Sequence, residues 1–237
     1  EKRGDTMTIR TLVLSGGGGR GAFHAGVYKY LSEANKPDVD ASHRGAWSPD
    51  IVVGTSIGAV NGAAITQGVT ADELERFWLS LRENDIQGLP PGMGWLARKV
   101  ANVVLRHAIG VPPETALSPG AEESWPPLPL LPRPLSERLI GRWSNLLDTS
   151  PLYHTLKSRL KLDETKIANS DKVLLISATN VRTGEGVIFS NKDITDPRTG
   201  TTRGDLKPEI TLMRIIASCS IPMVYPWTQD DGEVYWD

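Results

Sequence analysis

The sequence predicts a three-layer α/β/α fold with a mostly parallel central sheet, and two segments carry this prediction. Residues 8–14 are apolar and β-rich and run into the glycine segment 16–21, after which apolar residues recur at helical spacing to about residue 35. Residues 50–54 form a second short apolar stretch, and a helix of small residues at 59–67 follows. A strand, a tight turn and a helix, repeated, are typical of a parallel sheet covered by helices.

The later part of the chain continues the pattern of helices and strands. Thr70 and Glu73 fit a capping box for a helix to about residue 82, and Ser150 before Pro151 predicts the N-cap of a helix to about residue 160. Further along, we predict strands at 172–178 and 187–190 around a turn at 183–186, a helix at 210–218, and a final strand at 234–236 after a turn at 230–232.

The composition limits the class of protein. The chain has 237 residues, with 26 Lys and Arg against 28 Asp and Glu, so its net charge is −2 and a nucleic-acid partner is not expected. Hydrophobic residues make up 39% and charged residues 23%, which is ordinary for a globular protein. Cys219 is the single cysteine, so the sequence predicts neither a disulfide framework nor a cysteine-rich metal site.

The segment at about 84–149 differs from the rest of the chain. Ten of the 17 prolines fall between Pro90 and Pro134, and the segment lacks enough periodic apolar sequence for a core of its own. We therefore predict a single domain over 1–237 with an insertion or cap at about 84–149.

A helix predicted at 93–109 inside this segment is amphipathic and carries no acidic residue. Two interpretations stay open: the helix contacts an anionic membrane surface, or its apolar face packs on the core and its cations are solvated. The residues concerned are Leu96, Val100, Val103 and Val104 on the apolar face, and Arg98, Lys99 and Arg106 on the others.

No apolar run approaches the ~20 residues of a membrane-spanning helix. The start of the chain has neither an initiator Met nor the apolar region of a signal peptide, so we expect a trimmed boundary there. Together these features predict a cytoplasmic protein or one peripheral at a membrane surface.

Gly54, Ser56 and Gly58 fit the G-x-S-x-G pattern between a predicted strand and a predicted helix. In a nucleophile elbow, the serine lies on a sharp strand-to-helix turn, and the flanking glycines remove Cβ atoms that would clash there. The alternative is a glycine-rich turn with an incidental serine.

Gly16, Gly18 and Gly21 fit G-x-G-x-x-G after a strand, which is also the dinucleotide-binding pattern. That interpretation needs an acidic residue at the end of a second strand, whereas Asp38 and Asp40 fall in a predicted loop. A P-loop is excluded because no Gly-Lys-Ser/Thr follows. The remaining functional interpretation is an oxyanion hole built from backbone N–H groups of the glycine loop.

A serine nucleophile needs a base. The four histidines precede the last strands of the chain, and none falls in a segment expected to face Ser56; they are His24, His43, His107 and His154. Asp237 ends the predicted strand 234–236, so a carboxylate is the alternative base.

These motifs together resemble those of the patatin-like phospholipases, over about residues 9–83 and 149–237. Weaker similarities support the resemblance: residues 24–27, residues 178–180 with Thr183 and Gly184, and residues 217–222. The resemblance implies a serine acyl hydrolase with a Ser-Asp dyad, no catalytic histidine, and neither a metal nor an organic cofactor. It implies Ser56 as nucleophile, Asp237 as base, and an oxyanion hole at Gly17, Gly18 and Gly19. Arg20 matches the family's basic loop position, which steadies the loop or meets an anionic head group.

In the family the aspartate precedes Gly-Gly or Gly-Ala, whereas this sequence stops at Asp237. We therefore expect the C-terminal part of the domain to be missing. The predicted function is a lipid acyl hydrolase of the phospholipase A or esterase type, acting on a lipid or acyl-ester substrate. The alternatives are an α/β-hydrolase esterase with a Ser-His-Asp triad, and a non-catalytic or nucleotide-binding protein that uses the 16–21 loop.

Overall fold

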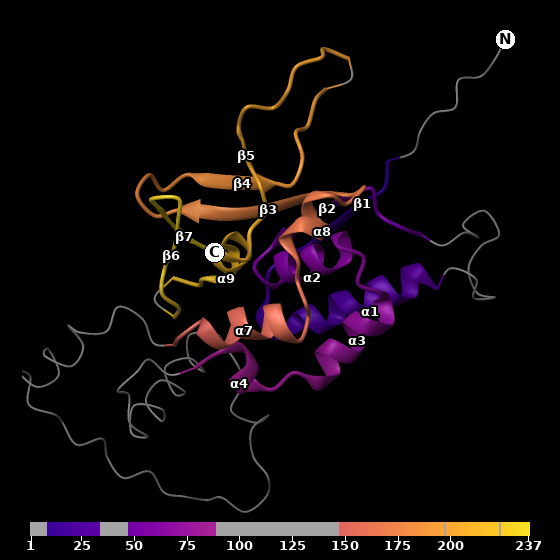
Figure 1. The fold of residues 1–237 in the computed structure, drawn as a ribbon, viewed down its shortest axis with the longest axis vertical. Helices are drawn as coiled ribbons and strands as arrows, with labels where there is room; N and C mark the ends of the chain where they lie inside the picture. Colours follow the sequence, from indigo (N-terminus) through magenta and orange to yellow (C-terminus); the bar gives the residue numbers. More distant parts are fainter. Residues whose placement is uncertain (1–8, 34–46, 89–146, 197, 223) are drawn as a thin grey trace, which may run out of the picture.

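The computed structural model describes residues 9–33, 47–88, 147–196, 198–222 and 224–237 (Figure 1). In chain order its elements are β1 (Thr11–Leu14), η1 (Gly18–Arg20), α1 (Gly21–Ser32), β2 (Ile51–Thr55), α2 (Ile57–Thr66), α3 (Ala71–Ser80), α4 (Glu83–Ile86), α7 (Ser150–Ser158), α8 (Glu164–Ala168), β3 (Val173–Asn180), β4 (Gly186–Ser190), β5 (Leu206–Pro208), α9 (Leu212–Cys219), β6 (Thr228–Asp230) and β7 (Glu233–Trp236).

The strands form one mixed sheet with the order β1-β2-β3-β4-β5, and β1, β2 and β3 are parallel. Their register places Leu14, Gly54 and Ile176 side by side. β4 runs antiparallel to β3, and β5 runs parallel to β4. The predicted α/β fold with a mostly parallel central sheet is confirmed.

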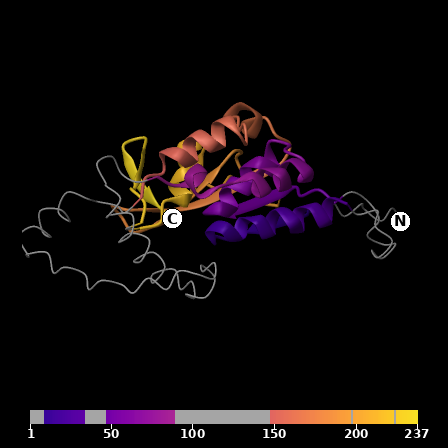
Figure 2. The same cartoon turned by 90° about the horizontal axis from the view of Figure 1, so that it is seen from below.

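β7 pairs with the same edge of β3 as β2 does, but with the part of that edge that lies beyond the end of β2. The β2–β3 pairing ends at Thr55 and Ser177, while β7 pairs antiparallel with Thr179 and Asn180. β4 already occupies the other edge of β3 at Thr179, so β7 lies beyond the end of β2 and runs back toward it. The C terminus consequently lies beside the β6–β7 hairpin, drawn in yellow (Figures 1 and 2).

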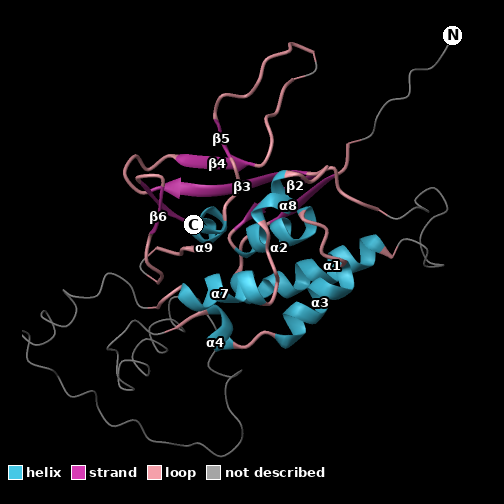
Figure 3. Cartoon of the chain, in the orientation of Figure 1, coloured by secondary structure: helices cyan, strands magenta, loops and turns pink. Residues whose placement is uncertain are grey.

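Helices α2 and α9 cover one face of the sheet, and α1, α3 and α7 lie outside them, so the helices gather on one side of the strands (Figure 3). All ten residues of α2 are buried, which its small side chains permit. The opposite face of the sheet carries partly or fully exposed side chains, such as Val13, Val53 and Leu175. No helix in the described ranges is both long and apolar enough to cross a bilayer.

The helix caps are partly as predicted. Thr70 and Glu73 form the capping box of α3, with Thr70 N donating to Glu73 Oε2 at 2.9 Å. The prediction of Ser150 as an N-cap is wrong: the N-cap of α7 is Thr149, and Ser150 is the first helical residue. Asp148 accepts hydrogen bonds from the backbone N–H and the hydroxyl of Ser150, so the acceptor that a cap would supply comes from Asp148.

Five short elements of the described residues were not predicted: η1, α4, α8, β5 and β6. Each has three to five residues, which is too few for a hydrophobic period to appear in the sequence. The predicted turn at 230–232 and the final strand are confirmed, and Asp231 and Gly232 have φ values of 49° and 75° in the β6–β7 hairpin.

Most of the predicted insertion, including the amphipathic segment 93–109, lies outside the described residues. Its two ends are described, and they meet: Gly88 and Asp148 form an antiparallel bridge with N–O distances of 3.0 and 2.8 Å. The chain thus leaves and re-enters the domain at one place, which agrees with an insertion. The insertion itself stays a prediction.

We expect Gly58→Ala to destabilise the fold strongly. A Cβ at this position would overlap the backbone carbonyl of Leu14, which cannot move without breaking the β1–β2 pairing. Overpacking of this kind costs about 1–3 kcal/mol or more of the unfolding free energy. Thermal denaturation followed by circular dichroism measures the loss.

Gly26→Ala is the matched control for this substitution. Gly26 also lies in a helix, but its added Cβ meets no atom within 4 Å, so we expect unchanged or slightly higher stability. Equal melting temperatures for the two variants would contradict the close approach at Gly58.

Candidate active site

Ser56 lies between β2 and α2, as the G-x-S-x-G pattern predicts. Its backbone has φ 55° and ψ −128°, and the residue is only 6% exposed. A non-glycine residue at such angles costs about 1–3 kcal/mol unless the surrounding structure holds it. Ser56 is therefore a strained residue at the N-terminal end of a buried helix.

Gly54 and Gly58 make this sharp turn possible. A Cβ on Gly54 would lie 2.5 Å from the carbonyl oxygen of Gly58 and 2.7 Å from Ala59. A Cβ on Gly58 would overlap the carbonyl group of Leu14 at the end of β1. The two glycines thus let the first turn of α2 pack directly on two strands.

The glycine loop lies against the serine. A Cβ on Gly16 would lie 3.2 Å from Ser56 Cβ, so the two sequence motifs meet. Gly17 and Gly18 have φ values of 144° and 55°, which disfavour any side chain, although Gly18 and Gly19 border open space. Arg20 N donates to Gly17 O at 3.1 Å, and the Arg20 side chain folds back toward Gly17.

Asn61 connects this loop to α2 and α3, and sequence reasoning missed it. Its side-chain Nδ2 donates to Gly21 O at 2.9 Å, and its Oδ1 accepts from Trp78 Nε1 at 2.9 Å. Asn61 is fully buried. Gly21 itself packs closely on Trp78 and Ile57, where a Cβ would come within 2.8 Å of Ile57 Cγ1. An asparagine inside an otherwise apolar helix was the signal available in the sequence.

Asp237 follows β7 and meets Ser56. The side chains of Ser56 and Asp237 lie next to each other. Partial burial raises the pKa of the Asp237 carboxyl above its ordinary value, and the neighbouring side chain of Ser56 lowers it again in part. A buried serine hydroxyl thus lies beside a partly buried carboxylate.

The C-terminal end of α9 holds both of these residues in position. Ser56 N donates to the side-chain Oγ of Ser218 at 2.8 Å, and Asp237 N donates to the carbonyl of Ser220 at 2.9 Å. Cys219 lies between the two serines, and burial, followed by the nearby charge of Asp237, raises the pKa of its thiol. The thiol therefore stays neutral beside the carboxylate.

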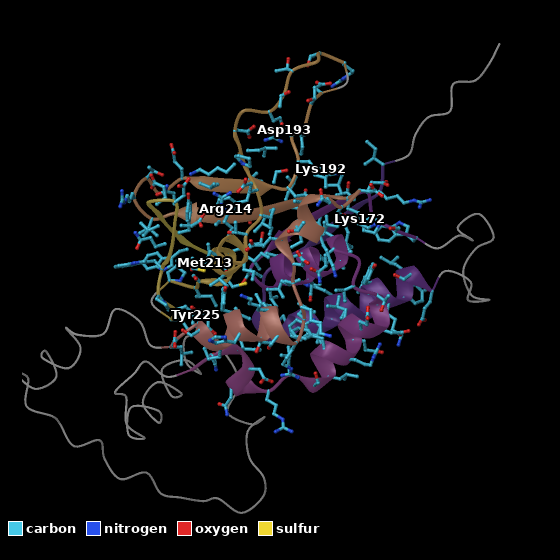
Figure 4. The ribbon with its side chains drawn as sticks, in the orientation of Figure 1. Lys172, Lys192, Asp193, Met213, Arg214 and Tyr225 are labelled. Atoms are coloured by element: carbon cyan, nitrogen blue, oxygen red, sulfur yellow. The ribbon has the colours of Figure 1, made fainter. Side chains whose placement is uncertain are left out.

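Arg214 anchors α9 to the strands (Figure 4). Its Nε donates to Asp230 on β6 at 2.7 Å, its Nη1 donates to the carbonyls of Pro208 and Glu209, and its guanidinium carbon lies 4.8 Å from the ring centre of Phe189. One arginine therefore connects the helix to β6, β4 and the end of β5.

The two described histidines are not bonded to Ser56. His24 on α1 is partly buried with a lowered pKa due to that burial, and its Nδ1 has no hydrogen-bond partner. His154 on α7 is exposed and lies edge-on to Tyr153. His43 and His107, like Asp38 and Asp40, lie outside the described residues.

The described residues contain no group of three or more His, Cys, Asp or Glu side chains placed to hold a metal ion. What the arrangement offers is a serine on a strained turn, a carboxylate next to it, and a glycine loop whose first residue lies against the serine.

A family model described as patatin-like phospholipase matches residues 12–237, nearly the whole chain. The chain belongs to the patatin-like phospholipase family. Among solved structures it is similar to VipD from Legionella pneumophila, with 16% sequence identity and a TM-score of 0.48. The match covers 97% of this chain but only 45% of that one. A comparison with curated proteins returned no match.

We expect Ser218→Ala to destabilise the folded protein by about 1–3 kcal/mol, because the buried N–H of Ser56 loses its acceptor. Urea denaturation measures the change. Ser32→Ala is the control, since the Ser32 hydroxyl only donates to a carbonyl within its own helix. A loss no larger than that of the control would contradict the role of Ser218.

Proposed function

We propose that the protein is a lipid acyl hydrolase of the phospholipase A or esterase type. Ser56 is the nucleophile, Asp237 the base, and the backbone of Gly17, Gly18 and Gly19 the oxyanion hole. The observation that carries the proposal is the proximity of the Ser56 and Asp237 side chains at a strained elbow. Membership of the patatin-like phospholipase family supports the class of reaction.

In the proposed mechanism, Asp237 accepts the proton of the Ser56 hydroxyl while Oγ attacks the ester carbonyl carbon. The proton then passes to the departing alcohol, which leaves an acyl-enzyme on Ser56. A water molecule gives its proton to Asp237 and attacks the acyl carbonyl. The bond to Ser56 Oγ then breaks, Oγ takes the proton back from Asp237, and the fatty acid is released. The raised pKa of Asp237 makes it a better base than an exposed aspartate, whose pKa is ~4.

The negative charge on the carbonyl oxygen develops beside the glycine loop. Gly16 packs on Ser56, so the following residues are close to the nucleophile, and the positive φ of Gly17 and Gly18 turns the backbone there. The N-terminal end of α2, which begins one residue after Ser56, adds the positive end of a helix dipole. Because an aspartate is a weak base, this stabilisation carries much of the rate enhancement.

An apolar surface beside the dyad supports an acyl chain as substrate. Trp227 is 51% exposed and its ring centre lies 6.1 Å from that of Trp236, the neighbour of Asp237. Ile221 is 37% exposed and directly follows Ser220, which holds the backbone of Asp237. Exposed apolar side chains grouped at a site favour a lipid over a polar ester.

We expect a fluorophosphonate to label Ser56 in the full-length protein, because the reagent traps activated serine nucleophiles. Ser56→Ala abolishes the labelling, and Asp237→Asn lowers ester hydrolysis by ~10³-fold or more, the scale for losing one member of a catalytic unit. Peptide mass spectrometry locates the adduct.

Ser158→Ala is the matched control for this labelling, since Ser158 lies exposed on α7 and its hydroxyl donates only to His154 O. An adduct on another serine, kept in Ser56→Ala and lost when that serine is replaced, would refute Ser56 as the nucleophile.

We expect hydrolysis to fall as the pH drops through the pKa of Asp237, because only the carboxylate accepts a proton. Burial raises this pKa, so the decline begins at a higher pH than an exposed aspartate would give. The pH profile of kcat/KM measures it. His24→Ala should keep this acid limb and stay within about tenfold of the parent activity. If a folded His24→Ala variant were as inactive as Ser56→Ala, the result would contradict the serine–aspartate mechanism and support a serine–histidine pair.

A further inference from the structure

A cavity lies at the opposite end of α2 from Ser56. Its volume is about 550 Å³, which is within the size range of ligand sites. It is lined by the C-terminal end of α2, by α3, and by the chain that leads from α7 past α2 to α8 (Figure 1). We call it the basic pocket.

Four cationic side chains and one carboxylate line the basic pocket: Arg76, Arg159, Lys161, Lys166 and Glu73. Glu73 is occupied by the capping box, where it accepts from Thr70 N at 2.9 Å and from Thr70 Oγ1 at 2.7 Å. The charges of Arg76 and Lys161 also help to lower the pKa of Glu73, so both cations lie near it.

Arg159 differs from the other cations because it is already paired. Asp85, which lies outside the lining, accepts from its guanidinium, and Ser80 O accepts a further bond at 2.8 Å. Within the part of the chain that the structure describes, Lys161 and Lys166 have no carboxylate within ion-pair distance, and Arg76 donates only to the carbonyl of Asp72. Three cations therefore face the cavity with a single carboxylate among them.

Lys161, which lines this cavity, has an energetically unfavourable backbone conformation. Lys161 has φ 52°, an unfavourable value for a residue with a side chain. The side chain of Gln67 holds the turn, since its Nε2 donates to Lys161 O at 3.2 Å and its Oε1 accepts from Asp163 N at 2.9 Å. The neighbours Leu160 and Leu162 are buried in the core. The cation is thus carried on a fixed turn.

We propose that the basic pocket binds a phosphate group, as an inorganic ion, a soluble monoester or a phosphomonoester lipid headgroup. A phosphate monoester carries up to two negative charges and several acceptor oxygens, and cations from three elements meet it at this place. The cavity is larger than one phosphate, so it leaves room for the group that the phosphate is attached to.

The basic pocket is separate from the candidate active site. α2 has ten residues and is therefore about 15 Å long, with Ser56 at its first end and Gln67 at its last. A ligand in the pocket does not reach Ser56. Binding there is independent of whether the protein hydrolyses esters.

Two titrations test the proposal on the full-length protein. Calorimetry with inorganic phosphate and with glycerol 3-phosphate measures the soluble source, and we expect saturable binding with a Kd of about 1 mM or below at low salt. Co-sedimentation with phosphatidylcholine vesicles that contain ether-linked phosphatidic acid measures the lipid source, because ether lipids resist hydrolysis at Ser56.

Lys161→Gln combined with Lys166→Gln should weaken binding of the phosphate probe by ~10-fold or more, since each lysine supplies a charge-assisted bond. Lys192→Gln combined with Arg198→Gln removes the same charge elsewhere, next to Asp193 (Figure 4) and at the exposed Arg198 beside Asp196, and should change binding by less than about twofold. Circular dichroism checks that both variants are folded.

Binding in either titration that is lost in the pocket variant and kept in the control supports the proposal and identifies the source of the phosphate. Absence of binding in both titrations would overturn it, as would equal weakening in the two variants.

Discussion

The backbone of Ser56 is held at a positive φ by the packing around it, and the rest of the candidate site depends on this one strained residue. Gly54, Gly58 and Gly16 contribute because a side chain on any of them would press on the elbow or on the strand beside it. α2 is buried along its whole length and cannot shift to relax the turn. Tight packing of small residues thus stabilises a positive-φ conformation that a serine would not keep in a loosely packed environment.

α9 joins two distant parts of the chain, around Ser56 and around Asp237, in one site. Its last turn accepts the N–H of Ser56 through Ser218 and the N–H of Asp237 through the carbonyl of Ser220. Arg214, one helical turn earlier, connects the same helix to the β6–β7 hairpin that carries Asp237. Ser56 and Asp237 are therefore both held by hydrogen bonds to the C-terminal end of the same helix.

The two ends of α2 have opposite electrostatic characters. At its N-terminal end, Ser56, Asp237 and a neutral Cys219 share a largely buried region, where the helix dipole favours a developing oxyanion. At its C-terminal end, Arg76, Lys161 and Lys166 face a cavity, where the dipole favours cations. One short helix thereby lies between the proposed acyl-transfer site and the proposed phosphate site.

Local sequence patterns determined the elements that have local causes: the elbow at Ser56, the glycine loop, the capping box at Thr70 and the final hairpin are each specified by residues within a few positions of one another. Strand pairing is not local. The local pattern placed Asp237 at the end of a late strand, and the family resemblance implied that it is the base for Ser56. Its meeting with Ser56 requires β7 to take the edge of β3 beyond the end of β2. The partners of Asn61 and Ser218 were not predictable for the same reason, since they lie far away along the chain. The sequence by itself thus determined which residues were able to react. Tertiary structure alone decided which of them are in contact, because contacts between distant segments depend on how the sheet and α9 pack together.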